Sequence, residues 1–191
     1  MSRGLGDVYK RQRYGREYTE EQITEAIATN AKGEDPYSIV ESKDEIGHGT
    51  MVAGIIGGRG INPELKGAAP DCEFVVVKLA KANEDELMRS YIDPKKNGYT
   101  PWNILLALRY TAAVGNQVNR PIVIYIPLGT NMSSHSGDGF LETPIENYSK
   151  QVGTLVVTNT GNQGNTETHV EGTINNTGDV NCSIFSLKLL T

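Results

Sequence analysis

The order of apolar and polar positions along the chain predicts alternating helices and strands. Apolar residues recur at helical spacing in three segments, residues 18–30, 101–119 and 140–153. Continuous apolar runs of strand length, rich in β-branched residues, occupy three others, residues 72–80, 121–129 and 154–161. From residue 72 onward the order is strand, helix, strand, helix, strand, which indicates a parallel sheet with right-handed crossovers. We expect an α/β fold, built as a three-layer sandwich.

Local signals mark where two of these helices begin. Thr19 can cap the first helix, with Glu20 and Glu21 in the turn where the helix dipole favours anions. Pro101 suits the first turn of the second helix. Its predicted buried face is formed by apolar side chains at helical spacing, Trp102, Leu105, Leu106, Ala112 and Ala113.

Composition and charge exclude several classes of function. The chain has 191 residues, 38% hydrophobic and 21% charged, which fits one ordinary globular domain. Its net charge of -5 comes from residues spread along the sequence, so no basic stripe is available for nucleic acid. The longest apolar run, residues 121–129, is far shorter than a membrane span. Cys72 and Cys182 lack CxxC spacing, and we expect buried thiols.

The ends of the chain differ in character from its middle. Residues 1–13 lack the apolar core of a signal peptide and resemble translated sequencing adaptor, so we expect an artefactual or disordered leader. Residues 14–164 carry the predicted α/β pattern. Residues 165–191 are rich in Asn, Thr and Gly and end in an alternating segment, which indicates the start of a β-rich insertion or second module. We therefore expect a fragment truncated at both ends, whose localisation stays open.

The first candidate for chemistry is His48, in the stretch "DEIGHGTMVAGIIGG" of residues 44–58. Gly47 and Gly49 let the backbone turn sharply beside it, Thr50 can support a first helical turn, and small apolar residues follow. An imidazole has an ordinary pKa near 6.5 and suits a general base in acyl transfer. The alternative is an exposed histidine in a glycine-rich turn.

The second candidate is Asn162, which lies just past the carboxyl end of the predicted strand at residues 154–161. Open α/β sheets place their ligands at this end of their strands. A side-chain amide there can donate to a developing oxyanion. The alternative is an asparagine in an ordinary Gly-Asn turn.

Three segments resemble the subtilisin-like serine peptidases (subtilases). The string "GHGTMVAG" resembles their His-Gly-Thr-x-Val-Ala-Gly block, "KGAAPDCEFVVVKL" their next strand, and "TLVVTNTGNQG" the strand that ends in Ala-Gly-Asn-x-Gly. The resemblance covers roughly residues 14–185 and is strongest to clostridial subtilases related to the germination proteases.

The resemblance implies a serine endopeptidase that cleaves peptide or protein substrates through an acyl-enzyme. It implies that His48 is the general base and Asn162 the oxyanion donor. It also implies that Leu128, Gly129 and Gly161 bind the substrate peptide, although Pro127 stands where the family has serine. No cofactor is implied.

Two members of the subtilase triad have no match in the sequence. Four Gly-Thr pairs occur, and none is followed by serine. No aspartate before His48 ends an apolar strand, and Asp44 is interpreted as a turn or substrate-cleft residue. We expect this chain alone to be inactive. The first alternative is a non-catalytic pseudoprotease with a binding or regulatory role. The second is a nucleotide-binding domain with a glycine-rich phosphate loop, which the polar segment before Gly47 disfavours.

No metal site is assigned. His135 and His169 lie in polar loops without a second ligand at zinc spacing. Asp138 and its neighbouring Asn and Ser oxygens are compatible with a structural calcium ion, but their spacing is not that of an EF-hand.

Overall fold

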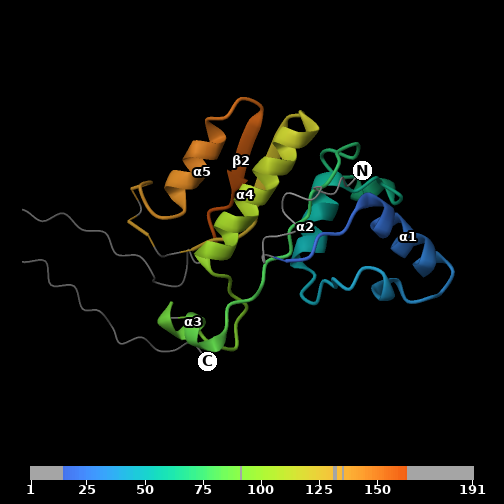
Figure 1. The fold of residues 1–191 in the computed structure, drawn as a ribbon, viewed down its shortest axis with the longest axis horizontal. Helices are drawn as coiled ribbons and strands as arrows, with labels where there is room; N and C mark the ends of the chain where they lie inside the picture. The colour runs from blue at the N-terminus through green and yellow to red at the C-terminus, as the bar shows by residue number, and fades with distance from the viewer. Residues whose placement is uncertain (1–14, 91, 131–132, 135, 163–191) are drawn as a thin grey trace, which may run out of the picture. The chain divides into compact units, whose positions relative to one another are not determined.

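The computed structural model describes residues 15–90, 92–130, 133–134 and 136–162. The chain divides into two compact units, one within Met1–Val76 and the other within Val77–Thr191, and each is described by itself (Figure 1). The predicted boundaries at residues 13/14 and 164/165 fall outside the described residues.

The first unit begins with helix α1 (Glu20–Ala31), which starts where the sequence predicts. Thr19 and Gln22 form a capping box, in which each side chain accepts a hydrogen bond from the other's backbone N–H. The chain then turns through the 3₁₀ helix η1 (Pro36–Ser38) and packs back against α1. Glu41 closes this return, since its N–H donates to the Tyr18 hydroxyl (3.1 Å) and its carboxylate pairs with Arg16 (2.6 Å).

Helix α2 (His48–Gly57) follows, and the short 3₁₀ helix η2 (Pro63–Leu65) comes after it. The segment of residues 67–69 returns to the carboxyl end of α2. Three N–H groups of this segment donate to carbonyls at the end of α2: Gly67 to Gly58 (2.8 Å), Ala68 to Ile55 (3.1 Å) and Ala69 to Ile56 (2.7 Å). The last carbonyls of a helix have no partners within it, so this segment caps α2.

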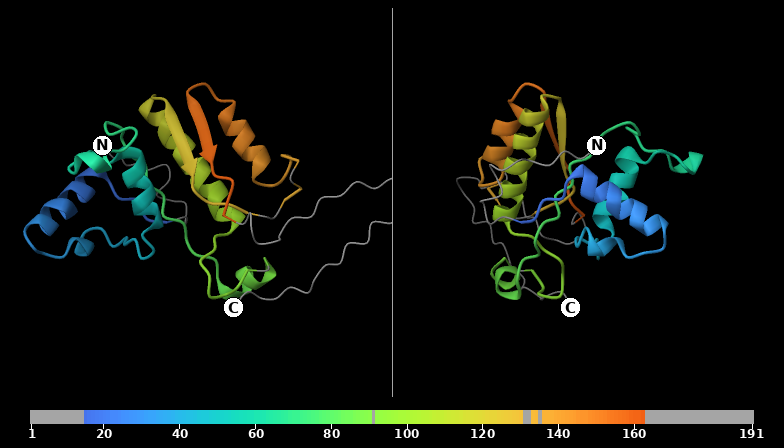
Figure 2. Two further views of the ribbon diagram at one scale, coloured as in Figure 1. Left: turned by 180° about the vertical axis from the view of Figure 1, so that it is seen from behind. Right: turned by 45° about the vertical axis from the view of Figure 1, so that its right-hand side comes forward.

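The second unit contains helix α3 (Glu84–Arg89), helix α4 (Pro101–Val118), strand β1 (Ile122–Ile126), helix α5 (Glu142–Ser149) and strand β2 (Thr154–Thr158). The two strands pair in parallel, from Ile122 beside Thr154 to Ile126 beside Thr158. Helices α4 and α5 contact each other and cover one face of the pair (Figure 2). The predicted α/β class with parallel strands is confirmed.

Successive side chains along each strand point to opposite faces of the sheet. Ile124 is buried on the face that α4 and α5 cover. The opposite face exposes four apolar side chains, Val123, Tyr125, Leu155 and Val157. Helices α4 and α5 therefore form one layer against the sheet.

The predicted strand at residues 72–80 is wrong, because this segment forms neither helix nor strand. A β-branched run becomes a strand only where its backbone pairs with a neighbour. In the described residues, the pairing is that of β1 with β2 and one isolated bridge between Arg59 and Lys66. Val76 is 77% exposed, and Cys72 is also exposed rather than buried. Cys182 lies outside the described residues.

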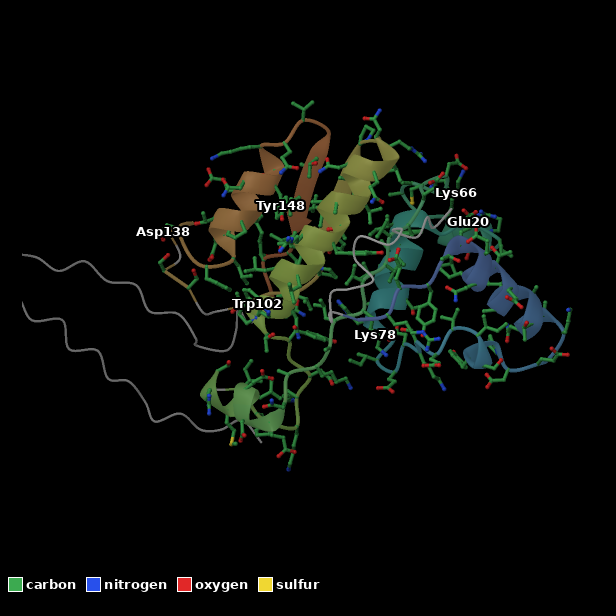
Figure 3. The ribbon with its side chains drawn as sticks, in the orientation of Figure 1. Glu20, Lys66, Lys78, Trp102, Asp138 and Tyr148 are labelled. Atoms are coloured by element: carbon green, nitrogen blue, oxygen red, sulfur yellow. The ribbon has the colours of Figure 1, made fainter. Side chains whose placement is uncertain are left out.

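The buried face of α4 lies further along the helix than predicted. Its buried residues are Leu108, Ala112, Val114 and Gly115, whereas Trp102 is 56% exposed at the start of the helix (Figure 3). An 18-residue helix is about 27 Å long and a five-residue strand about 17 Å. Since β1 runs back from the carboxyl end of α4, the first turns of α4 extend beyond the strand.

Candidate functional site

His48 is the first residue of α2, at the position that the glycine-flanked motif predicts, and its side chain is exposed. The residue before it, Gly47, has a φ of 82°, in the left-handed region that favours glycine. Because Gly47 has no side chain, it supplies no side-chain cap for the helix. The amino end of α2 must therefore be capped from elsewhere.

The Asp44 carboxylate supplies that cap. One oxygen, Oδ1, accepts from the N–H groups of Ile46 (3.1 Å) and Gly47 (2.8 Å). The other, Oδ2, accepts from the N–H (3.2 Å) and the hydroxyl (2.5 Å) of Thr50. These bonds, with the Thr50 hydroxyl contributing most, hold the pKa of Asp44 well below its usual range. Asp44 is thus a turn residue, one of the two roles expected of it.

A second group of predicted residues lies where the two parallel strands end. β1 leads into Pro127, Leu128 and Gly129, and β2 leads into the segment of residues 159–162. The Thr158 hydroxyl donates to the Ile126 carbonyl (3.2 Å), which ties the two strand ends together. Parallel strands in register send their continuations out at the same edge of the sheet, so these segments leave side by side.

The two continuations approach most closely at their glycines. A Cβ placed on Gly129 would lie 3.0 Å from the Gly161 Cα and 3.4 Å from the Asn159 Oδ1. Gly161 has a φ of 80°, and its N–H donates to the Asn159 Oδ1 (3.0 Å). We call the four residues Leu128, Gly129, Gly161 and Asn162 the strand-end cluster. The structure brings Gly129 and Gly161 together, with Leu128 and Asn162 next to them in the sequence, whereas His48 belongs to the other unit.

Sequence reasoning missed the part played by Asn159. Its side chain closes a turn by accepting from the N–H two residues further on, a pattern that Asn and Asp favour. The signal was present, because an asparagine two positions before a glycine is typical of such turns. The contact of this turn with Gly129 had no sequence signal, because it joins positions 32 residues apart, Gly129 and Gly161.

The polar loop before α5 contains Asp138 (Figure 3). Its carboxylate accepts from the hydroxyls of Ser134 and Ser136, and these bonds lower the pKa of Asp138. Among the residues that the structure describes, no group of three His, Cys, Asp or Glu side chains is placed to hold a metal ion. His135 and His169 lie outside the described residues. In the same part of the chain, no helix has the length and hydropathy needed to cross a membrane.

Comparison with known proteins agrees with these features. The model of the subtilase family, Peptidase_S8, matches residues 7–183. Among solved structures, the chain is similar to the CspB protease of Clostridium perfringens, with a TM-score of 0.67 and 32% sequence identity. The match covers 81% of this chain and 30% of that protein, so this chain spans about a third of the length of CspB. No curated protein gives a significant match. The chain belongs to the subtilase family of serine peptidases.

Proposed function

We propose that this chain carries part of the catalytic machinery of a subtilisin-like serine endopeptidase. In such an enzyme, a serine hydroxyl attacks the peptide carbonyl, a histidine takes the hydroxyl proton, and hydrogen-bond donors stabilise the oxyanion that forms. His48 would act as the base and Asn162 as an oxyanion donor. Membership of the family and the likeness to a protein named as a protease support this activity class.

The observation that carries the proposal is the strand-end cluster. An extended peptide that pairs with residues 127–129 by strand addition would run along the edge of the sheet. Gly129 adjoins the turn of residues 159–161, and Asn162 follows that turn. A peptide carbonyl bound beside Gly129 would lie next to the segment that carries Asn162, the residue proposed as oxyanion donor.

A non-catalytic pseudoprotease is the second candidate. The whole protein's sequence distinguishes the two candidates, because an intact peptidase carries a Gly-Thr-Ser motif and a triad aspartate outside the motifs of this chain. A pseudoprotease would use the same strand-end cluster to bind peptide without cleaving it. Peptide binding at this cluster is therefore expected of both candidates, and cleavage separates them.

Peptide binding can be tested by NMR with the isotope-labelled chain and a blocked tetra-alanine peptide. We expect the amide signals of Leu128, Gly129 and Gly161 to shift on titration, together with the side-chain amide of Asn162. G129A should weaken binding, because its Cβ would lie 3.0 Å from the Gly161 Cα and displace the turn. G54A is the matched control, because a Cβ there meets nothing within 4 Å. Shifts absent from all four residues would refute the proposed site.

A further inference from the structure

The amino end of α2 is capped in an uncommon way. The first N–H groups of a helix have no partners within it, and usually the side chain of the N-cap residue accepts from the third helical residue. In α2 the N-cap is Gly47 and the third helical residue is Thr50. Glycine has no side chain to accept the Thr50 N–H. Another acceptor must take its place for this end to be defined.

Asp44 takes that place from three residues before the N-cap. Its Oδ2 accepts the Thr50 N–H, as an N-cap side chain would, and also accepts the Thr50 hydroxyl. Its Oδ1 accepts the N–H groups of Ile46 and Gly47, on the other side of His48 in the sequence. One carboxylate thus ties together the backbone before His48 and the helical turn after it.

Two further observations show that this arrangement uses the ionised carboxylate. The carboxylate is the acceptor in all four hydrogen bonds, and a protonated carboxyl would offer less acceptor capacity. The pKa of Asp44 is correspondingly lowered. An anion beside the amino end of a helix is also stabilised by the helix dipole.

We infer that Asp44 is a positioning residue for His48, acting through the turn of residues 44–47 and through Thr50. It fixes the backbone from which the imidazole projects, and so selects the direction in which the ring can point. The inference rests on the proposed function, in which His48 is the base. It replaces the interpretation of Asp44 as a substrate-cleft residue, because both carboxylate oxygens already bind the chain's own donors.

The test compares variants that remove parts of the Asp44 bonding. T50V is nearly isosteric and removes the hydroxyl donor but keeps the N–H, whereas T50S keeps both. D44N removes the charge and leaves one acceptor oxygen, whereas D44A removes both acceptor oxygens. D35N is the matched control in the same unit, because the Asp35 Oδ1 accepts a single N–H from Tyr37 and an asparagine can do the same.

The signals to follow are the ring nitrogens of His48 in a long-range proton–nitrogen spectrum, and the exchange rate of the Thr50 amide. The sequence has three histidines, so H48Q identifies the relevant signals. We expect T50V and D44N to shift the His48 ring signals. The exchange of the Thr50 amide should accelerate by about 2- to 30-fold in D44A, the range for replacement of a helix cap by alanine. T50S and D35N should match the unmodified chain.

His48 ring signals that are unchanged in T50V and D44N, while Thr50 exchange accelerates, would show that Asp44 caps the helix without positioning His48. Unchanged Thr50 exchange in D44A, which has no side-chain acceptor, would refute the capping itself. T50V retains the carboxylate, so it gives a result even if D44N does not fold. These signals are measured without substrate, so they stand apart from peptide binding at the strand-end cluster, whose failure would refute the proposed function instead.

Discussion

The exposed Asp44 carboxylate shows how a single residue can define a local structure without being buried. Helices α1 and α3 begin with capping boxes, in which partners three residues apart bind each other's backbone. α2 has a glycine at the N-cap, and its cap comes from outside the helix. The cost of removing Asp44 should therefore appear locally, around His48 and Thr50.

The ionisation of Asp44 can be measured from its side-chain carboxyl carbon in an NMR titration. We expect a midpoint below about 3.9, the ordinary pKa of aspartate, because the bonds from Thr50 and the turn favour the charged form. T50V should raise the pKa of Asp44 toward that value, because the Thr50 hydroxyl contributes most to the shift. T50S is the control and should leave it low.

The lowered pKa of Asp44 determines how its contribution to folding stability depends on pH. A carboxyl group whose pKa is lower in the folded state contributes its stabilisation fully above the unfolded pKa, near 3.9. That contribution is lost as the pH falls from there toward the folded pKa. An Asp44 that titrates at the ordinary value in the folded chain would contradict the described bonding.

At the scale of the element, α2 is a helix defined by its two ends. No residue of α2 is buried, and hydrogen bonds cap both of its ends. Asp44 holds its amino end, and the segment of residues 67–69 holds its carboxyl end. Gly54 within α2 and Gly67 beside it should therefore respond very differently to substitution.

Gly54 and Gly67 provide a matched pair for this expectation. A Cβ on Gly54 meets nothing within 4 Å, so G54A should raise the free energy of unfolding by about 0.5–1 kcal/mol, the advantage of alanine over glycine in a helix. A Cβ on Gly67 would lie 2.5 Å from the Gly58 N, so G67A should lower it by about 1–3 kcal/mol. Urea unfolding followed by circular dichroism measures both. Equal effects of the two substitutions would show that residues 67–69 do not cap α2.

Periodicity and local signals predicted the elements whose neighbours are close in sequence. α1 with its Thr19 cap, α4 with Pro101 in its first turn, and the β1–α5–β2 crossover are all confirmed. The strand expected at residues 72–80 failed because strand formation depends on a distant partner. The predicted burial of Trp102 is wrong because helical periodicity indicates which face of a helix is buried. It does not indicate how far the neighbouring strand extends along that face.

At the site, too, sequence patterns predicted local features but not contacts between distant segments. The motif placed His48 at the start of a helix, and strand prediction placed Asn162 past the end of a strand, where the structure has it. Leu128 was expected inside the strand of residues 121–129, but β1 ends at Ile126. The approach of Gly129 to Gly161 and the four bonds of Asp44 are tertiary geometry that no residue pattern encodes. The catalytic roles of these residues stay predictions.

At the scale of the whole molecule, this chain spans about a third of the length of CspB. Its sequence supplies a histidine and an asparagine in subtilase motifs, but neither a Gly-Thr-Ser nor an aspartate that ends an apolar strand before His48. A base without a positioned nucleophile cannot form an acyl-enzyme. The family's activity and the activity of this chain are thus separate questions.

We expect the purified chain of residues 1–191 to remain unlabelled by a fluorescent fluorophosphonate, because no serine occupies a subtilase nucleophile position. The measurement is in-gel fluorescence, with an active serine peptidase labelled in parallel to show that the probe reacts. Labelling of this chain that disappears in H48A would contradict the prediction, and would show that His48 activates a serine outside the expected motif.

The remote cap of α2 has a consequence for access to the imidazole. Because Asp44 takes over the work of an N-cap side chain, the residue before His48 can be glycine, and the residue after it is glycine too. A Cβ at either position would meet no other described atom within 4 Å. The bonds of Asp44 hold the backbone on both sides of His48, although neither neighbouring residue carries a side chain. A polypeptide that approaches His48 would therefore meet no side chain from the residue before or after it.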